Sequence, residues 1–508
     1  TNTVWGYVPE RGEILVSPTR PTEVTPVGGT VPISWGALDK LYQGGWKNTT
    51  ITNNYVSFFA TFAYSLKDRY VFNANIRSDA SNRFGQDANK QFDPTYSLGV
   101  SWRMAEEEFV KTHLPWINQL NMRATYGVQG NVVTSVSPDL ITQYQGILSG
   151  YNEYYLTISS LPNPLLKWER TKTWNLGLDL QLFNGITMSL EYYGRRSNAI
   201  INQDIAQEYG MNTMRLNGGR IHNHGLEYSM NITPYQRKDF AWTIGFNASK
   251  NWNKTQNDDI RTKADKITKS DFISGSSDRF LKKGYPLSAF WSYSFAGLDP
   301  ETGYPTFNLI DFEEADPDID PTTFLVYSGQ KDPYFTGGIN TRIRYKSLSL
   351  GVNFSVLLGA KKRLPNPYQN FNYGKLPTPF YNLSKDLLKR WQKPGDEKHT
   401  IYPALYTSVE DVYNIKLPDG TSSNSIYAMW GNSDAMVVNA SFLRCTQISL
   451  SWNIPAQICS KFGATNCSIS ANVNNPFVIG SSRFNGFDPE LGDSVMPKVF
   501  SFGLSVGF

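Results

Sequence analysis

The chain ends in Lys498-Val499-Phe500-Ser501-Phe502-Gly503-Leu504-Ser505-Val506-Gly507-Phe508. Within this stretch, large apolar residues alternate with Ser or Gly, and the apolar set is Phe500, Phe502, Leu504, Val506 and Phe508. A period of two places the two sets on opposite faces of a β-strand. A terminal strand of this kind that ends in Phe is typical of the closing strand of an outer-membrane β-barrel. We therefore expect the even positions to face lipid and the odd positions to face the lumen.

The same alternation recurs along the chain. It is present at 96–104, 120–128, 174–182, 226–232, 240–246 and 348–356. In each segment, apolar residues alternate with Gly or with polar or charged residues, as in strands whose two faces meet different solvents. The pattern predicts an all-β protein built as a transmembrane antiparallel β-barrel.

The connections between these segments differ in length. Short ones lie at 67–68, 184–185, 234–238 and 345–347, and long polar ones lie at 80–94, 129–167, 199–219, 253–286, 311–333, 359–437 and 475–497. Long and short alternate if one further strand lies at about 303–310. The count is then about fifteen strands within 51–508, and a weaker candidate at 11–17 makes about sixteen. Short periplasmic turns and long extracellular loops are the arrangement of outer-membrane barrels.

Composition fits this prediction. The mean hydropathy is −0.39, and there is no run of about eighteen apolar residues, so we expect no transmembrane helix. A net charge of +4 on 508 residues is too small to indicate a nucleic-acid partner. Backbone groups in hydrocarbon must all be paired, so the sheet has to close. Charges on the polar faces, such as Arg123, Asp179 and Glu191, predict a wet lumen that can hold a polar solute or a polar plug.

The long loops carry aromatic and amide side chains, which suit sugar rings or extended peptides. The candidate ligand contacts are Tyr151, Tyr154, Tyr155, Asn370, Tyr373 and Trp430. Packing of one loop against another uses the same residue types and is the alternative for each of them.

Metal and catalytic chemistry are less well supported. His222 and His224 share a strand face, but no carboxylate or Cys spacing completes a zinc site. Carboxylate oxygens are the ligands that calcium prefers, and an acidic run could supply them, but its spacing does not match an EF-hand loop. The run consists of Asp311, Glu313, Glu314, Asp316, Asp318 and Asp320. We therefore expect no cofactor, with calcium as the alternative. No catalytic triad motif or phosphate-binding loop is present, so no enzyme activity is expected.

The chain contains three cysteines, Cys445, Cys459 and Cys467. An odd count does not indicate a disulfide framework. Cys459 and Cys467 are close enough in sequence to pair across a turn, and the sequence leaves that pairing open.

Several longer motifs point to a known family. They are Arg77-Ser78-Asp79-Ala80-Ser81-Asn82-Arg83-Phe84-Gly85, Arg123-Ala124-Thr125-Tyr126-Gly127 with Gly130-Asn131, Gly284-Tyr285-Pro286-Leu287, Gly297-Leu298-Asp299-Pro300-Glu301-Thr302-Gly303, Asn474-Asn475-Pro476-Phe477 and Gly486-Phe487-Asp488-Pro489-Glu490. With these motifs, the chain from about residue 55 onward resembles the C-terminal half of a SusC/RagA-type TonB-dependent outer-membrane transporter.

The resemblance implies a barrel of about 22 strands with a plug inside. Residues 1–50 are then a loop with a possible first strand, and 51–508 are the C-terminal barrel strands. The plug, the TonB-contacting segment and about six strands are expected outside this chain. The closing strand should pair with a strand at 465–474 and with a first strand that is not in this sequence. A barrel of about sixteen strands formed by this chain alone is the alternative.

The function implied by the resemblance is active import of oligomeric nutrients, either glycans or peptides, across the bacterial outer membrane. The implied partners are TonB, which acts through the absent N-terminal part, and a SusD-like surface lipoprotein over the long loops. Two alternatives remain open on the sequence: a passive porin-type channel, and a secreted β-rich adhesin or lectin.

Overall fold

The computed structural model describes residues 7–8, 13–14, 23–24, 31–32, 54–81, 92–131, 133, 139–148, 150–151, 153–183, 185–211, 213–256, 282–308, 325–368, 382–405 and 426–508. The chain divides into two compact units, Thr1–Asn54 and Tyr55–Phe508. In the first unit, β1 (Tyr7–Val8) pairs with β2 (Glu13–Ile14), and β3 (Glu23–Val24) pairs with β4 (Val31–Pro32). All other elements belong to the second unit.

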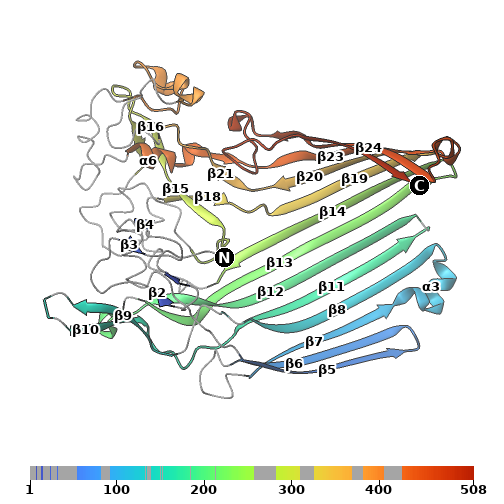
Figure 1. Cartoon of the computed structure of the whole chain (residues 1–508), viewed down its shortest axis with the longest axis horizontal. Helices are drawn as coiled ribbons and strands as arrows, with labels where there is room; N and C mark the ends of the chain where they lie inside the picture. Colours follow the sequence, from blue (N-terminus) through green and yellow to red (C-terminus); the bar gives the residue numbers. More distant parts are fainter. Residues whose placement is uncertain are drawn as a thin grey trace. The chain divides into compact units, whose positions relative to one another are not determined.

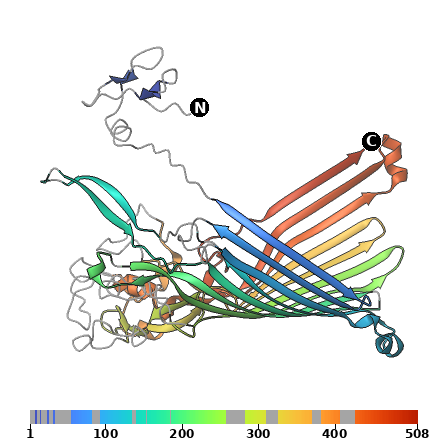
Figure 2. The same cartoon turned by 90° about the horizontal axis from the view of Figure 1, so that it is seen from below.

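Within the described residues of the second unit, thirteen strands form one antiparallel sheet in which neighbours along the chain are neighbours in the sheet. Its strands are β5 (Tyr55–Leu66), β6 (Tyr70–Ser81), β7 (Phe92–Arg103), β8 (Ile117–Asn131), β11 (Glu169–Leu182), β12 (Ile186–Asp204), β13 (Thr213–Gln236), β14 (Phe240–Thr255), β19 (Phe335–Tyr345), β20 (Leu348–Leu358), β23 (Phe442–Ile454), β24 (Asn466–Gly480) and β25 (Val499–Gly507). Figures 1 and 2 show this sheet as a curved surface that is open between β5 and β25.

Tight hairpins fix the register at one end of the sheet. Lys67 and Asp68 both take left-handed backbone conformations, with φ of 53° and 54°, as the primed turns of short hairpins require. The β5–β6 ladder then runs without a shift from Leu66↔Tyr70 to Tyr55↔Ser81. Because side chains alternate with period two, this register puts Phe58, Phe62 and Tyr64 of β5 on the same face as Phe72 and Ile76 of β6.

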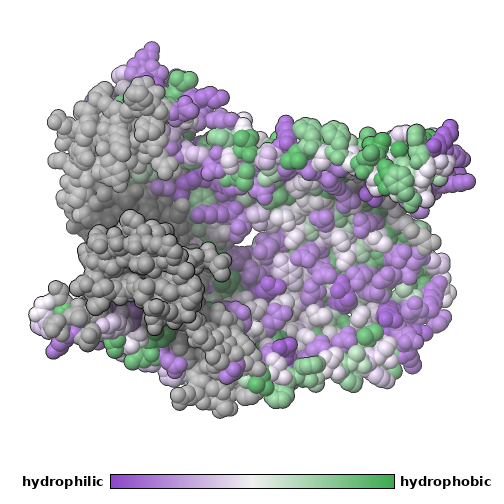
Figure 3. All heavy atoms as spheres, in the orientation of Figure 1, coloured by the Kyte–Doolittle hydropathy of each residue, from purple (hydrophilic) through white to green (hydrophobic). Residues whose placement is uncertain are grey.

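The two faces of the sheet differ in chemistry, as the sequence predicts. The apolar residues of β25 remain exposed, with Phe502 at 83%. Apolar residues of the other strands are exposed in the same way, among them Phe62, Leu98, Met122, Leu176, Leu350, Leu450 and Ile469. Figure 3 shows hydrophilic residues predominating on the inner face of the curved sheet. An outward apolar face and an inward polar face are the arrangement that a lipid-facing barrel wall needs.

The predicted neighbour of the closing strand is confirmed. β24 pairs with β25 over the whole of β25, from Asn474↔Val499 to Asn466↔Gly507. The C-terminus lies at the same end of the sheet as the short turns (Figure 1). β5 and β25 are the outer strands of the described sheet, and each has a neighbour on one side only.

In the described residues the sheet has thirteen strands, two fewer than the fifteen predicted for 51–508. β14 pairs directly with β19, from Phe240↔Tyr345 to Lys250↔Phe335, so no barrel strand lies between them. The described part of the segment expected as a strand at about 303–310 contains β17 (Pro305–Phe307), which pairs with β16 (Phe295–Leu298), and β15 (Ala289–Tyr293) precedes them. Every residue of β15 is buried, whereas a barrel strand leaves alternate residues to lipid. The candidate strand at 11–17 also lies outside the sheet in its described residues, because Glu13–Ile14 pairs with β1.

Small two-stranded sheets occupy the end of the barrel wall opposite the tight turns (Figure 1). β15 pairs with β18 (Leu325–Gln330), β16 with β17, and β21 (Lys361–Arg363) with β22 (Val437–Asn439). Isolated bridges Tyr293↔Ser433 and Gln330↔Ala360 connect them. Short helical segments lie with them: α6 (Ile426–Gly431), η5 (Lys385–Lys389), η6 (Asp396–Lys398), η7 (Asp434–Met436) and η9 (Ser482–Phe484). The hairpin of β9 (Ile141–Leu148) and β10 (Glu153–Ser160) projects from the same end of the wall, as does η2 (Gln207–Tyr209).

At the tight-turn end, η1 (Met104–Glu106) and α3 (Glu108–His113) connect β7 to β8, and α7 (Ala456–Cys459) and η8 (Ser460–Phe462) connect β23 to β24. Glu107 accepts hydrogen bonds from Arg69, Tyr70 and Trp102, at 2.9, 2.7 and 3.1 Å. These bonds fix the β7–β8 connection against β6. Among the described residues, no helix is both long and apolar enough to span a membrane.

Candidate functional site

A cluster of buried apolar residues lies in the loop assembly, which comprises the described residues of 282–308, 325–334, 359–368, 382–405, 426–441 and 481–498. Its centre is a cluster of Tyr368, Tyr427 and Trp430, each with no exposed surface. Tyr368 stacks on Tyr427 with ring centroids 5.0 Å apart and meets Trp430 edge-on at 5.2 Å. Contacts of this geometry add to the stabilisation that burial alone provides.

The polar atoms of this cluster are all used inside the protein. The hydroxyl of Tyr368 donates to the carbonyl of Pro403 at 2.6 Å, and that of Tyr427 donates to the carbonyl of Ala404 at 2.7 Å. The indole N–H of Trp430 donates to the carbonyl of Ile401 at 2.9 Å. Burial raises the pKa of the Tyr368 phenol far above its ordinary value. The cluster therefore holds separate parts of the 359–441 connection in one arrangement.

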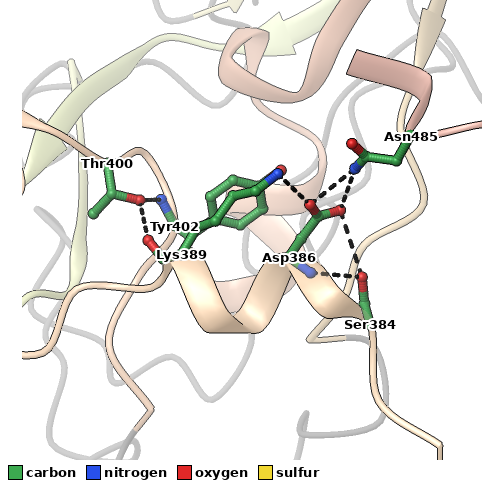
Figure 4. A network of polar contacts seen from close by, with 6 residues as sticks. All are labelled: Ser384, Asp386, Lys389, Thr400, Tyr402 and Asn485. Atoms are coloured by element: carbon green, nitrogen blue, oxygen red, sulfur yellow. Dashed lines mark hydrogen bonds and ion pairs between the residues drawn. The ribbon is translucent and has the colours of Figure 1, made fainter. Parts of the chain in front are cut away.

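Asp386 joins two loops that are distant in the sequence (Figure 4). Its carboxylate accepts hydrogen bonds from Lys389 at 2.8 Å and from the side-chain amide of Asn485 at 2.9 Å. The hydrogen bond to Asp386 raises the pKa of the Lys389 ammonium. The backbone N–H of Asp386 donates to Ser384, which begins this helical turn. Because Asn485 lies in the last loop before β25, Asp386 fixes that loop to the loop between β20 and β23.

A buried ion pair anchors the same last loop to the barrel wall. Arg444, near the start of β23, donates to Asp488 at 2.6 Å and lies 2.9 Å from a carboxylate oxygen of Glu490. The side chains of Arg444 and Asp488 are each 4% exposed, whereas Glu490 is 50% exposed. The carboxylate of Asp488 also accepts the backbone N–H of Glu490 at 2.9 Å. Both charges are thus hydrogen-bonded, as burial of an ion pair requires.

The inner face of the wall carries a second polar network. Arg123 in β8 contacts Asp179 in β11 at 2.9 Å and Glu191 in β12 at 2.8 Å. Ser189 donates to Asp179 at 2.8 Å, and Asn175 donates to Glu191 at 2.9 Å. A Cβ at Gly177 would lie 3.1 Å from the Arg123 guanidinium, so glycine lets this arginine lie across β11. The predicted polar lumen face thus carries charges that are already paired within the wall.

Beside this network lies a cavity of about 350 Å³ on the inner face. Its polar lining residues are Ser189, Glu191, Glu227, Ser229, Asn247, Ser249 and Thr336. A polar, partly acidic surface of this kind suits a hydrated lumen or a polar insert better than hydrocarbon.

The structure places the predicted ligand contacts in different settings. Tyr151 and Tyr155 lie on the β9–β10 hairpin and are 76% and 37% exposed. Tyr154 lies in β10, but its side chain is outside the described residues, as are Asn370 and Tyr373 entirely. Trp430 is fully buried in the tyrosine cluster, in the packing role that the sequence left as its alternative. The described candidates therefore do not form one site. Asp386 and Asp488 each anchor the last loop, and no local sequence motif indicates that they share this role.

The described residues give no support to a metal centre or a disulfide. No group of three or more His, Cys, Asp or Glu side chains in the described part of the chain can hold a metal ion. His224 stacks on Trp252 with ring centroids 5.1 Å apart. The acidic run from Asp311 to Asp320 lies outside the described residues. Cys445, Cys459 and Cys467 are free thiols, although Cys459 and Cys467 lie within hydrogen-bonding distance of each other.

Comparison with known proteins agrees with this architecture. A family model described as TonB dependent receptor-like, beta-barrel, matches residues 17–354. The TonB-dependent receptor SusC of Bacteroides thetaiotaomicron is 28% identical over 483 residues, which cover 90% of this chain and 44% of SusC. The TonB-dependent receptor P3 of Formosa agariphila is 24% identical over 463 residues, covering 86% of this chain and 42% of the relative.

Among solved structures, the RagAB peptide importer in the open-open state superposes with a TM-score of 0.69 at 22% identity, over 90% of this chain and 47% of that one. A second structure, of the RagAB peptide transporter, gives a TM-score of 0.68 at 22% identity, over 90% of this chain and 48% of that one. At this identity the likeness shows the fold. The chain spans less than half the length of the relatives it matches.

Proposed function

Because the chain belongs to the TonB-dependent receptor-like β-barrel family, we propose that it forms part of the wall of an outer-membrane transporter that imports oligomeric nutrients with energy supplied through TonB. The chain is part of a bacterial outer-membrane β-barrel. Transport, rather than catalysis, is the activity that we assign to it.

One observation carries the proposal. The sheet exposes a continuous apolar face on its outside and a charged, hydrogen-bonded face on its inside, so each face matches a different solvent. In hydrocarbon an unpaired strand edge costs several kcal/mol per unsatisfied backbone group. The outer edges of β5 and β25 therefore need further strands, which we assign to the remainder of the same barrel. A wide lumen of this kind also needs a plug to prevent leakage, and we assign TonB coupling to that plug.

The proposed cargo is a glycan or peptide oligomer that is captured together with a SusD-like surface lipoprotein. Likeness to SusC and to a structure named as a peptide importer supports this class of cargo. We propose that the described parts of the long connections form a platform at the extracellular end, in which Asp386 and Asp488 anchor the last loop. Tyr151 and Tyr155 are exposed aromatic side chains on the projecting β9–β10 hairpin, and we propose them as ligand or partner contacts.

The test uses the full-length gene product in a host with and without TonB. Uptake of labelled oligosaccharides and peptides should require both the protein and TonB. A passive porin predicts uptake that persists without TonB, and this result would overturn the proposal. A secreted adhesin or lectin predicts extraction without detergent and no heat-dependent change in gel mobility. Tyr151→Ala with Tyr155→Ala should reduce capture while leaving the gel-mobility change intact.

A further inference from the structure

A cavity of about 820 Å³ opens within the loop assembly, apart from the inner face of the barrel wall. It is formed by β15, β21, the end of α6 and the last loop before β25. The residues that define its chemistry are Lys331, Lys361, Lys362, Arg363, Leu364 and Asp493. A volume of this size is within the usual range for ligand pockets.

Its lining is strongly cationic. Among the described residues, the lining includes four basic residues, Lys331 and the three of β21, and one acidic residue, Asp493. Within the described residues, neither Lys361 nor Lys362 forms an ion pair, and the ammonium of Lys362 donates to the carbonyl of Glu490. Like charges gathered in a concave site focus a positive potential that favours an anionic ligand.

The cations are held in place by the surrounding backbone. Gly329, with φ of 113°, lies where a Cβ would be 2.5 Å from Cγ of Lys361. Gly492, with φ of 91°, lies where a Cβ would be 3.2 Å from Cδ of Lys362. Only glycine combines this backbone conformation with so close an approach. Each of the two lysine stems therefore lies against the backbone of a glycine.

Arg363 is also fixed. Its guanidinium donates to the carbonyl of Trp291 at 2.5 Å and to the hydroxyl of Ser292 at 3.0 Å. It lies over the ring of Phe290, 5.1 Å from the centroid, and the ammonium of Lys331 lies 5.9 Å from the same centroid. Phe290 is 1% exposed, so its ring contacts Arg363 and Lys331 and is not accessible to a ligand.

We propose that this cavity binds a carboxylate-bearing segment of a peptide cargo, and that it gives the transporter a preference for acidic peptides. The inference rests on the proposed import function. Lysine ammonium groups donate strong hydrogen bonds to carboxylates, and the exposed side chains of Pro365 and Leu491 can accompany a peptide backbone. Sugar rings usually need an exposed aromatic face, which the described lining residues do not offer, because Phe290 is buried.

The test uses purified full-length protein and three probes: a hexapeptide of alternating Ala and Glu, the same peptide with Gln in place of Glu, and a galacturonic acid trimer. The wild type should bind the Glu peptide about 10- to 100-fold more tightly than the Gln peptide, as expected for one or two partly exposed charge-assisted hydrogen bonds. This preference should shrink when NaCl is raised from about 50 mM to about 500 mM.

The variant Lys361→Gln with Lys362→Gln should lose the preference while still binding the Gln peptide. The matched control is Lys385→Gln with Lys393→Gln, two exposed lysines of the loop assembly that do not line the cavity. That control should bind as the wild type does. Heat-dependent gel mobility reports whether each variant is folded. The peptide comparison on the wild type needs no variant and can refute the proposal alone.

Equal binding of the two peptides by the wild type would overturn the proposal. Retention of the preference by the folded cavity variant would also overturn it, as would tighter binding of the galacturonic acid trimer than of the Glu peptide. Failure of the proposed function looks different: uptake of every cargo would then be independent of TonB. TonB-dependent uptake without a preference for acidic peptides would refute the role assigned to the cavity and leave the proposed transport function standing.

Discussion

The buried pair of Arg444 and Asp488 gives the sharpest prediction about the loops. Asp488→Asn removes one charge from a pair that is 4% exposed on both sides. Breaking a buried ion pair costs about 3–5 kcal/mol. The lower end applies here, because Glu490 stays 2.9 Å from Arg444 and asparagine can still accept the N–H of Glu490. About 3 kcal/mol corresponds to an increase of about 100-fold in the local opening equilibrium.

Hydrogen exchange of the full-length protein measures this opening directly. The reporter amides are those of Asp488, which donates to the carbonyl of Ser494 at 2.8 Å, and Gly492, which donates to the carbonyl of Asp488 at 2.7 Å. Both should exchange about 100-fold faster in Asp488→Asn, while amides of the barrel strands keep their protection.

Glu490→Gln is the matched control for that experiment. Glu490 is half exposed, so its ion pair contributes at most about 1 kcal/mol, and exchange should change by less than about fivefold. The double variant Arg444→Met with Asp488→Leu should recover much of the protection, because an apolar pair avoids the uncompensated charge. Exchange in Asp488→Asn within about threefold of the wild type, or equal effects of Asp488→Asn and Glu490→Gln, would refute the reasoning.

Three further predictions concern the closing strand and one turn. Phe502→Lys on the lipid face should lower the free energy of unfolding by about 2–4 kcal/mol in urea titrations in lipid vesicles, whereas Ser501→Lys on the lumen face should not. Deleting Phe508 should reduce the amount of heat-modifiable barrel in outer-membrane fractions, and a normal amount would contradict the assigned role of the closing strand. Hydrogen bonds from the backbone and side chain of Thr302 hold the pKa of Asp299 below its ordinary value of 3.8. The turn is therefore stabilised in full above that value and loses this stabilisation as pH falls through the lowered folded pKa. Proteolysis of the loop as a function of pH should show this loss, and Asp299→Asn should remove the pH dependence.

The barrel wall was predictable because one constraint, lipid outside and water inside, acts on every strand. That constraint acts on consecutive residues. The alternation from Phe500 to Phe508 therefore identifies β25, and the hairpin turn at Lys67-Asp68 locates β5 and β6. The wrong strand prediction concerns the loop assembly, where this constraint no longer acts. Residues 303–310 are predicted as a barrel strand, but their described part forms β17, which pairs with β16 in the loop assembly. The preceding β15 is buried at every residue, and its nearly continuous apolar run reflects packing within that assembly.

The loop assembly was much less predictable. Trp430 looks the same in sequence whether its ring faces a ligand or packs against Tyr368, because residue type does not encode burial within an irregular loop. The cationic cavity was missed because its lining comes from residues near 290, 331, 362, 430 and 492, which no local pattern connects. A signal was nevertheless present: Lys361-Lys362-Arg363 is a run of three basic residues directly after a barrel strand.

The direct pairing of β14 with β19 has an evolutionary consequence. Residues 256–334 enter and leave the wall between two strands that already share a complete ladder. This segment can therefore be lengthened, shortened or exchanged without altering the β14–β19 ladder, provided that Tyr334 keeps its backbone bonds to Asn251 and Leu358. The same holds for residues 359–441, which leave β20 and return to β23. Because both segments and the last loop line the same cavity, recombination would have to exchange all three together to transfer recognition, and such chimeras should keep the barrel intact.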